Sequence, residues 1–91
     1  MLKNYTSSGG TAIDSLGKEI ALVSTIIHNP SANFEKAEIS LVKEGISVTY
    51  FSGELDPKET LFLDTKIFLS NGDEIRVSGA NFIFSGNEDV I

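Results

Sequence analysis

Hydrophobic and polar positions alternate along much of this chain with the two-residue period that is typical of β-strands. In the segment 34–42, FEKAEISLV, the apolar residues Ala37, Ile39 and Leu41 alternate with polar ones, which predicts one dry and one wet face. The segment 19–29, EIALVSTIIHN, is apolar at both parities, so we expect a central or covered strand there. The first of these segments also contains good helix formers, but its alternation favours a strand.

Residues that favour turns divide the chain at intervals of about 8–12 residues. The main breaks are NPSAN at 29–33, Glu44-Gly45 and SGELDPKE at 52–59. The remaining β-rich runs lie at 46–51, 60–69, 74–79 and 81–86. The sequence therefore predicts an all-β fold, a small antiparallel β-sandwich (Ig-like or jelly-roll-like) of about seven or eight short strands.

The clearest turn signal is Asn71-Gly72, between the runs KIFLS and DEIRV. Asn-Gly is favoured in two-residue hairpin loops because both positions there need positive φ. We therefore predict Asn71 and Gly72 as a structural hairpin turn, with Leu69 and Ile75 near the base of two paired strands. The acidic pair Asp73-Glu74 beside the turn is interpreted as solvated rather than as a functional site.

The first 17 residues differ in composition from the rest of the chain. They are rich in Ser, Thr and Gly, and SSGG at 7–10 is typical of a flexible segment. The predicted organisation is a flexible N-terminal arm at 1–17, either disordered or ordered on a partner, and one β-sandwich domain at 18–91. A chain of this size buries only roughly 60–65% of the surface that its unfolded form exposes, so a partner or an oligomer would help to stabilise it.

Charge and composition argue against several classes of protein. The net charge is −6, and the basic residues are scattered singly, whereas proteins that bind duplex nucleic acid cluster Lys and Arg. We therefore expect no nucleic-acid partner. No apolar run approaches the roughly 20 residues that span a bilayer, and the N-terminal segment MLKNYTSSGG lacks the apolar region of a signal peptide. No membrane association is expected.

The residues that usually carry catalysis are few. There is no cysteine, and His28 is the single histidine, which excludes a zinc site rich in Cys or His. His28 ends an apolar strand without a nucleophile motif nearby, so we interpret it as structural. Carboxylates that could serve glycoside hydrolysis are present, but a chain this short leaves little room for a deep cleft. We therefore expect no enzyme, no catalytic residue, no cofactor and no small-molecule substrate.

Calcium is the metal for which the sequence leaves an alternative open. Ca²⁺ takes about six to eight oxygen ligands, which acids in loops can supply. The acids that could converge at one end of a sandwich are Glu54, Asp56, Asp64, Asp73 and Glu74. Their spacing does not match that of an EF-hand, so the prediction is that no metal binds.

Three pieces of the chain resemble a family of small structural proteins of tailed bacteriophages. They are NYTSSGG at 4–10, IIHNPSAN at 26–33 and LDPKETLFLDTKIFLSNGDEIRVSG at 55–79. The resemblance implies a non-enzymatic component of the virion, made in the host cytoplasm: a capsid decoration protein, a head–tail neck protein, or a tail or fibre adaptor. It carries no catalytic residues, because the matching positions are turns and core.

The resemblance also implies assembly with copies of the same chain and with other virion proteins. Identical subunits commonly adopt closed rotational symmetry, so we predict a cyclic homo-oligomer, a trimer first and a hexamer second. The interface candidates are Tyr5, in the arm on a neighbouring subunit, and Phe82 and Phe84, whose strand is predicted at a sheet edge. The alternative is a stand-alone Ig-like recognition module for a carbohydrate or a host surface protein, although the absence of Trp disfavours sugar binding.

Overall fold

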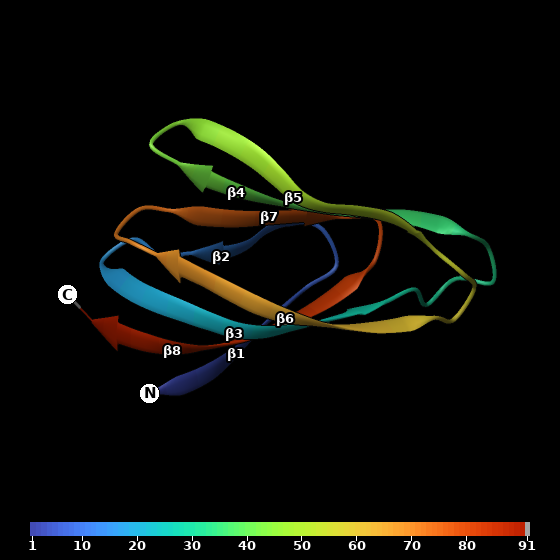
Figure 1. Ribbon diagram of the computed structural model, residues 1–91, viewed down its shortest axis with the longest axis horizontal. Helices are drawn as coiled ribbons and strands as arrows, with labels where there is room; N and C mark the ends of the chain where they lie inside the picture. The colour runs from blue at the N-terminus through green and yellow to red at the C-terminus, as the bar shows by residue number, and fades with distance from the viewer. Residues whose placement is uncertain (91) are drawn as a thin grey trace.

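The computed structural model describes residues 1–90, and it is all-β. Eight strands form two four-stranded antiparallel sheets, so the predicted β-sandwich is confirmed (Figure 1). Sheet A has the strand order β1-β8-β3-β6, and sheet B has the order β2-β7-β4-β5. The strands are β1 (Leu2–Ser7), β2 (Gly10–Asp14), β3 (Lys18–His28), β4 (Glu35–Lys43), β5 (Ile46–Leu55), β6 (Thr60–Leu69), β7 (Glu74–Ser78) and β8 (Asn81–Val90). Within these residues no helix is long and apolar enough to cross a membrane.

The strand order is that of a jelly roll, so the second of the two expected sandwich types is the one observed. β1 pairs with β8, β2 with β7, β3 with β6 and β4 with β5, as if one long hairpin had been rolled up. Only β4 and β5 are neighbours both in sequence and in a sheet; every other connection passes from one sheet to the other. This topology brings the ends of the chain together, and the amino group of Met1 donates to the carbonyl of Glu88 at 3.1 Å.

The hydrophobic core lies between the sheets and takes alternate residues from both. Half of the apolar residues of β3 are buried in this core, namely Ile20, Leu22 and Ile27. The largest fully buried side chains are Phe82 and Phe84 of β8, whose rings stack with centroids 6.2 Å apart. The other core residues are Ile13, Ala37, Ile39, Leu55, Leu69, Ile75, Val77 and Ala80.

The position of β8 corrects one prediction. Phe82 and Phe84 were expected at a subunit interface on an edge strand, but β8 lies inside sheet A, between β1 and β3. Their side chains are only 1% and 0% exposed, so they are core residues and not interface residues. The physical reason is the rolled hairpin, which places the last strand between the first and the third.

The N-terminal segment corrects a second prediction. Residues 1–17 were expected to form a flexible arm, but they contribute β1 to sheet A and β2 to sheet B. Tyr5 pairs with Phe84 of its own chain and packs against the core. β8 supplies the backbone partners of β1, and β7 supplies those of β2, so composition alone did not reveal the order of this Ser- and Thr-rich segment.

The turn at Asn71-Gly72 corrects a third prediction in part. A tight turn is present, because the amide of Asp73 donates to the carbonyl of Ser70 at 3.0 Å and Gly72 has a φ of 89°. It is not a hairpin, because it joins β6 of sheet A to β7 of sheet B. The two-residue hairpin loop with positive φ at both positions is Glu44-Gly45, with φ of 51° and 79°, between β4 and β5.

Candidate functional site

The outer face of sheet A carries exposed apolar side chains. Ile26 of β3 lies in register between Ile83 of β8 and Phe62 of β6, which forms a row across three strands. Phe62 is 74% exposed and Ile83 is 39% exposed. A second group lies on the same face, where Phe68 pairs with Ala21. We call this surface the apolar face; its members are Ala21, Val23, Ile26, Phe62, Phe68 and Ile83.

Strand β6 forms one open edge of this sheet. It is ten residues long and pairs with β3 alone among the described strands. Its residues alternate between exposed and covered positions without a break from Thr60 to Leu69. The backbone groups on its free side therefore have no strand partner, and such an edge invites pairing with another chain.

Two shallow hollows flank β6. One has a volume of about 380 Å³ and lies between β5 and β6, where Tyr50 and Phe51 face Leu63 and Ile67. Burial raises the pKa of Tyr50 to about 12. The other hollow, of about 320 Å³, is lined by residues 21–23 and 66–68. Both hollows are lined mainly by apolar surface. The side of the sandwich around β6 therefore exposes hydrophobic surface that is not buried in the core.

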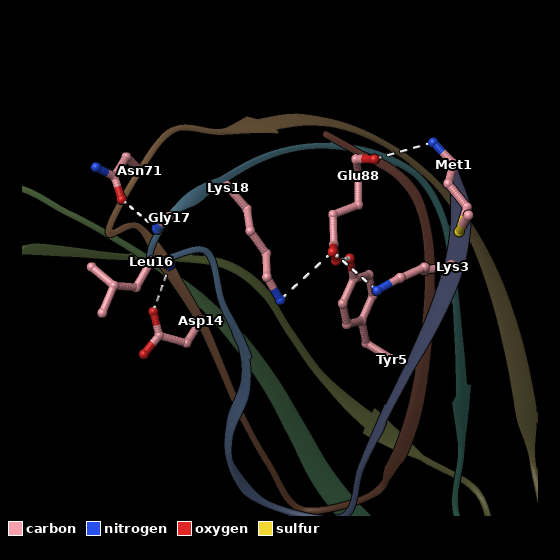
Figure 2. Close-up of polar contacts among 9 residues, drawn as sticks. All are labelled: Met1, Lys3, Tyr5, Asp14, Leu16, Gly17, Lys18, Asn71 and Glu88. Atoms are coloured by element: carbon pink, nitrogen blue, oxygen red, sulfur yellow. Dashed lines mark hydrogen bonds and ion pairs between the residues drawn. The ribbon is translucent and has the colours of Figure 1, made fainter. Parts of the chain in front are cut away.

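A buried carboxylate, Glu88, holds the two ends of the chain together (Figure 2). Its side chain is 5% exposed, and one oxygen accepts from Lys3 at 3.1 Å and lies 3.6 Å from Lys18. The other oxygen accepts a hydrogen bond from the hydroxyl of Tyr5. Every partner comes from the protein itself, so we assign the cluster a structural role: it fastens β1 and β3 to β8.

The cluster shifts the pKa values of its members in opposite directions. The hydrogen bond from Tyr5, the bond from Lys3 and the charge of Lys18 hold the pKa of Glu88 below its ordinary value, against the effect of burial. Burial, with the hydrogen bond to Glu88 and its negative charge, raises the pKa of Tyr5 well above its ordinary value. A carboxylate with a lowered pKa stabilises the fold at neutral pH, and this contribution is lost as the pH falls through its folded-state pKa.

We expect Glu88→Gln to lower the melting temperature at pH 7, because the amide cannot carry the negative charge that Lys3 and Lys18 face. The difference from the wild type should begin to shrink as the pH falls below the ordinary glutamate value of 4.5. It should be lost as the pH falls through the lower folded-state pKa of Glu88, where the wild-type carboxylate also becomes neutral. Thermal unfolding followed by circular dichroism from pH 3 to pH 7 measures this. Glu19→Gln, at an exposed position on β3, is the matched control and should change little at any pH. A difference between Glu88→Gln and wild type that stays constant with pH would contradict the assignment.

The two members of the acidic pair beside the Asn71-Gly72 turn have different surroundings: Glu74 is half-buried and pairs with Arg76 at 3.3 Å, whereas Asp73 is held inside the turn. Asp73 is 5% exposed; its carboxylate accepts from the amide of Ser70 at 2.8 Å and pairs with Lys43. Ser15 donates its hydroxyl to the carbonyl of Asp73 at 2.8 Å, and the amide of Gly17 donates to the side chain of Asn71 at 2.6 Å (Figure 2). Asp73 is therefore buried in a turn, contrary to the expectation that it is solvated.

The candidate calcium ligands do not converge at one end of the sandwich. Glu54 and Asp56 flank Leu55, which pairs with Glu35 at the start of β4. Glu74 instead pairs with Val42, near the other end of β4. Among residues 1–90, no group of three or more acidic or histidine side chains is placed to hold a metal ion.

Residues at the end of β3 tie neighbouring loops together. His28 shares a hydrogen bond of 2.8 Å between its Nδ1 and the hydroxyl of Thr60. Asn29 is fully buried, and its side-chain amide donates to the carbonyls of Asn33 at 2.8 Å and Asp56 at 3.1 Å. The NPSAN segment, predicted as a simple turn, is thus connected to the loop between β5 and β6.

Sequence reasoning did not select the exposed residues that form the apolar face. A signal for two of them was present in TLFLDTKIFL, where Phe62 and Phe68 share a parity with the charged residues Asp64 and Lys66. Charged residues rarely face a core, so this parity marks the outer side of the strand. For Ile26 and Ile83, the sequence offers no comparable signal.

No protein-family model matches the chain, and no curated protein matches it.

Proposed function

We propose that the protein is a non-enzymatic structural component of a tailed-bacteriophage virion that acts through contacts with copies of itself and with other virion proteins. The apolar face carries this proposal, because it leaves Phe62 and Phe68 more than half exposed on a regular sheet. The row of Phe62, Ile26 and Ile83 is continuous across three strands, and contiguous exposed apolar patches mark interaction surfaces. An exposed β-sheet face also suits a contact with another protein better than the enclosure of a small substrate.

The fold and the resemblance agree with this role. Jelly rolls occur in viral capsid proteins as well as in lectins and cupins, so the fold favours the proposal only as an analogy. The longest resembling piece, at 55–79, includes the whole of β6 and therefore two members of the apolar face. Capsid decoration, a neck position and a tail or fibre adaptor are the three positions that the resemblance suggests.

The proposed oligomer no longer depends on Phe82 and Phe84, since both are buried. A cyclic trimer or hexamer stays a prediction, and its contacts would have to involve the apolar face or the free strand edges. The proposed oligomer does not depend on Tyr5 either, because the hydroxyl of Tyr5 donates a hydrogen bond to Glu88 within its own chain.

The proposal is tested by asking whether the protein is part of phage particles. Particles released from cells that carry the gene are purified on a density gradient and probed with an antiserum against the protein. We expect the protein to migrate with the particles, and we expect Ile83→Asn to lose this association. Leu16→Asn is the control, because Leu16 is 72% exposed and lies outside the apolar face, in the connection between β2 and β3.

Wild-type protein found only at the top of the gradient, and absent from particles, would overturn the virion role. Association that survives Ile83→Asn would show that the apolar face is not the contact. Circular dichroism of both variants excludes unfolding as the cause of a loss.

A further inference from the structure

The free edge of β6 has a sequence that is complementary to its own reverse. Around Thr65, residues at equal distances before and after it match in kind. Asp64 matches Lys66 with opposite charge, and Phe62 matches Phe68 with the same ring. The apolar pairs Leu63 with Ile67 and Leu61 with Leu69 continue the pattern outward.

Antiparallel pairing of a strand with its own copy places such residues directly opposite one another. Around a two-fold axis, residue i faces residue j of the other copy, and j faces i. With the axis at Thr65, Asp64 of each copy faces Lys66 of the other, and Phe62 faces Phe68. Opposite charges and aromatic pairs at facing positions both stabilise a sheet.

Charge distinguishes β6 from the other three strands at sheet edges. β1 contains one base, Lys3, while β2 and β5 contain one acid each, Asp14 and Glu54. A second copy of any of these strands would bring only a charge of the same sign. β6 alone contains one acid and one base, so it is locally neutral in a chain whose net charge is −6.

We propose that two copies of the chain pair through β6, antiparallel and with Thr65 at the two-fold axis. This inference rests on the proposed assembly function and specifies one of its contacts. The pairing extends sheet A of one copy into sheet A of the other and forms one continuous eight-stranded sheet. Phe62, Asp64, Lys66 and Phe68 of both copies then form a single row of facing pairs on the outer face.

The inner side of the edge also suits a second copy. Leu63 and Ile67 line the apolar hollow of about 380 Å³ together with Tyr50 and Phe51. In the proposed register, Ile67 and Leu63 of the second copy approach the rim of this hollow and cover it. The β3–β6 ladder is irregular at the proposed axis: Leu22 pairs with Ile67 and Ser24 with Asp64, so Thr65 and Lys66 together stand opposite Val23. The alternation of exposed and covered residues along β6 nevertheless continues through this point.

The contact closes on itself. Both free β6 edges are used, so the pairing forms a dimer instead of an open filament. A two-fold contact fits a dimer, or a hexamer with two-fold axes perpendicular to its three-fold axis, and it occurs in neither the cyclic trimer nor the cyclic hexamer predicted from the sequence.

Exchange of the facing charges tests the register. Asp64→Lys places Lys against Lys twice, and Lys66→Asp places Asp against Asp twice, so each variant should weaken the dimer by about tenfold or more in sedimentation equilibrium. The double variant, Asp64→Lys with Lys66→Asp, should recover wild-type association. A mixture of the two single variants should form a heterodimer, because every facing pair is then of opposite charge. Both positions are exposed, so the variants should fold, and circular dichroism checks this.

Lys58→Asp, an exposed charge reversal outside β6, is the matched control and should leave the dimer intact. A monomeric wild type, single variants that associate as well as the wild type, or a mixture that does not form the heterodimer would each overturn the pairing. These results leave the virion proposal to be judged by the particle experiment, since a chain that joins particles through the apolar face does not need the β6 contact. Conversely, a β6 dimer with no protein in particles would support this inference while the virion role fails.

Discussion

Gly79→Ala is expected to destabilise the protein by about 3–5 kcal/mol, close to the largest effects seen for single substitutions. Gly79 begins the connection from β7 to β8, with a φ of 87°. A Cβ atom at this position would lie 1.8 Å from the carbonyl oxygen of Lys36 and 2.8 Å from its carbonyl carbon. These are backbone atoms of β4, so the clash could be relieved only by moving one strand relative to the turn.

Gly72→Ala separates this clash from the conformational strain of a left-handed backbone. Gly72 has nearly the same φ, 89°, but a Cβ atom added there would meet no other atom within 4 Å. We therefore expect a loss of only about 1–2 kcal/mol there. Urea denaturation followed by circular dichroism measures both variants. Equal losses at the two positions would show that the close approach to Lys36 is not the cause.

Phe84→Ala is expected to lower the free energy of unfolding by about 3–5 kcal/mol. Phe84 is fully buried in the centre of sheet A, stacks on Phe82 and pairs with Tyr5 and Thr25 across its two neighbouring strands. Removal of the ring leaves a cavity that regular strands on both sides can fill only in part. The loss should appear in the unfolding of dilute protein, where association contributes least.

Phe34→Ala is the control for the aromatic ring itself. Phe34 is 60% exposed and lies just before β4, so its removal should change stability by less than about 0.5 kcal/mol. A small effect of Phe84→Ala on the free energy of unfolding, with a large effect on association, would instead support the assignment of Phe84 to a subunit interface.

Strands β3 to β8 were predicted from the local sequence pattern, whereas their neighbours in the sheets were not. The run 81–86 was correctly predicted as a strand. Whether that strand is central or at an edge depends on β1 and β3, which lie far away in the sequence. Period-two alternation carries no information about such distant partners, so the interface prediction was wrong although the strand was right.

The turn at Asn71-Gly72 shows the same limit. Its local chemistry predicted a tight turn, and a tight turn is present. Its hairpin role failed because the strands on either side belong to different sheets. The Glu88 cluster was beyond sequence reasoning, since Lys3 and Tyr5 meet a carboxylate more than 80 residues away. By contrast, the charged parity of Asp64 and Lys66 was readable from the sequence, and it is the part of the candidate site that could have been predicted.

The rolled-up pairing has a consequence for the order in which the chain can fold. The pairing of Lys43 with Ile46 closes a short loop, whereas that of Leu2 with Asn87 closes nearly the whole chain. Loop closure becomes more costly in entropy as the loop grows, so the β4–β5 hairpin is the least costly place to start and β1 is the costliest strand to dock. On the ribosome, β1 emerges first but has no partner until β8 has been made. The newly made chain must therefore keep its first strand unpaired through most of its synthesis, and folds with many such distant contacts complete slowly.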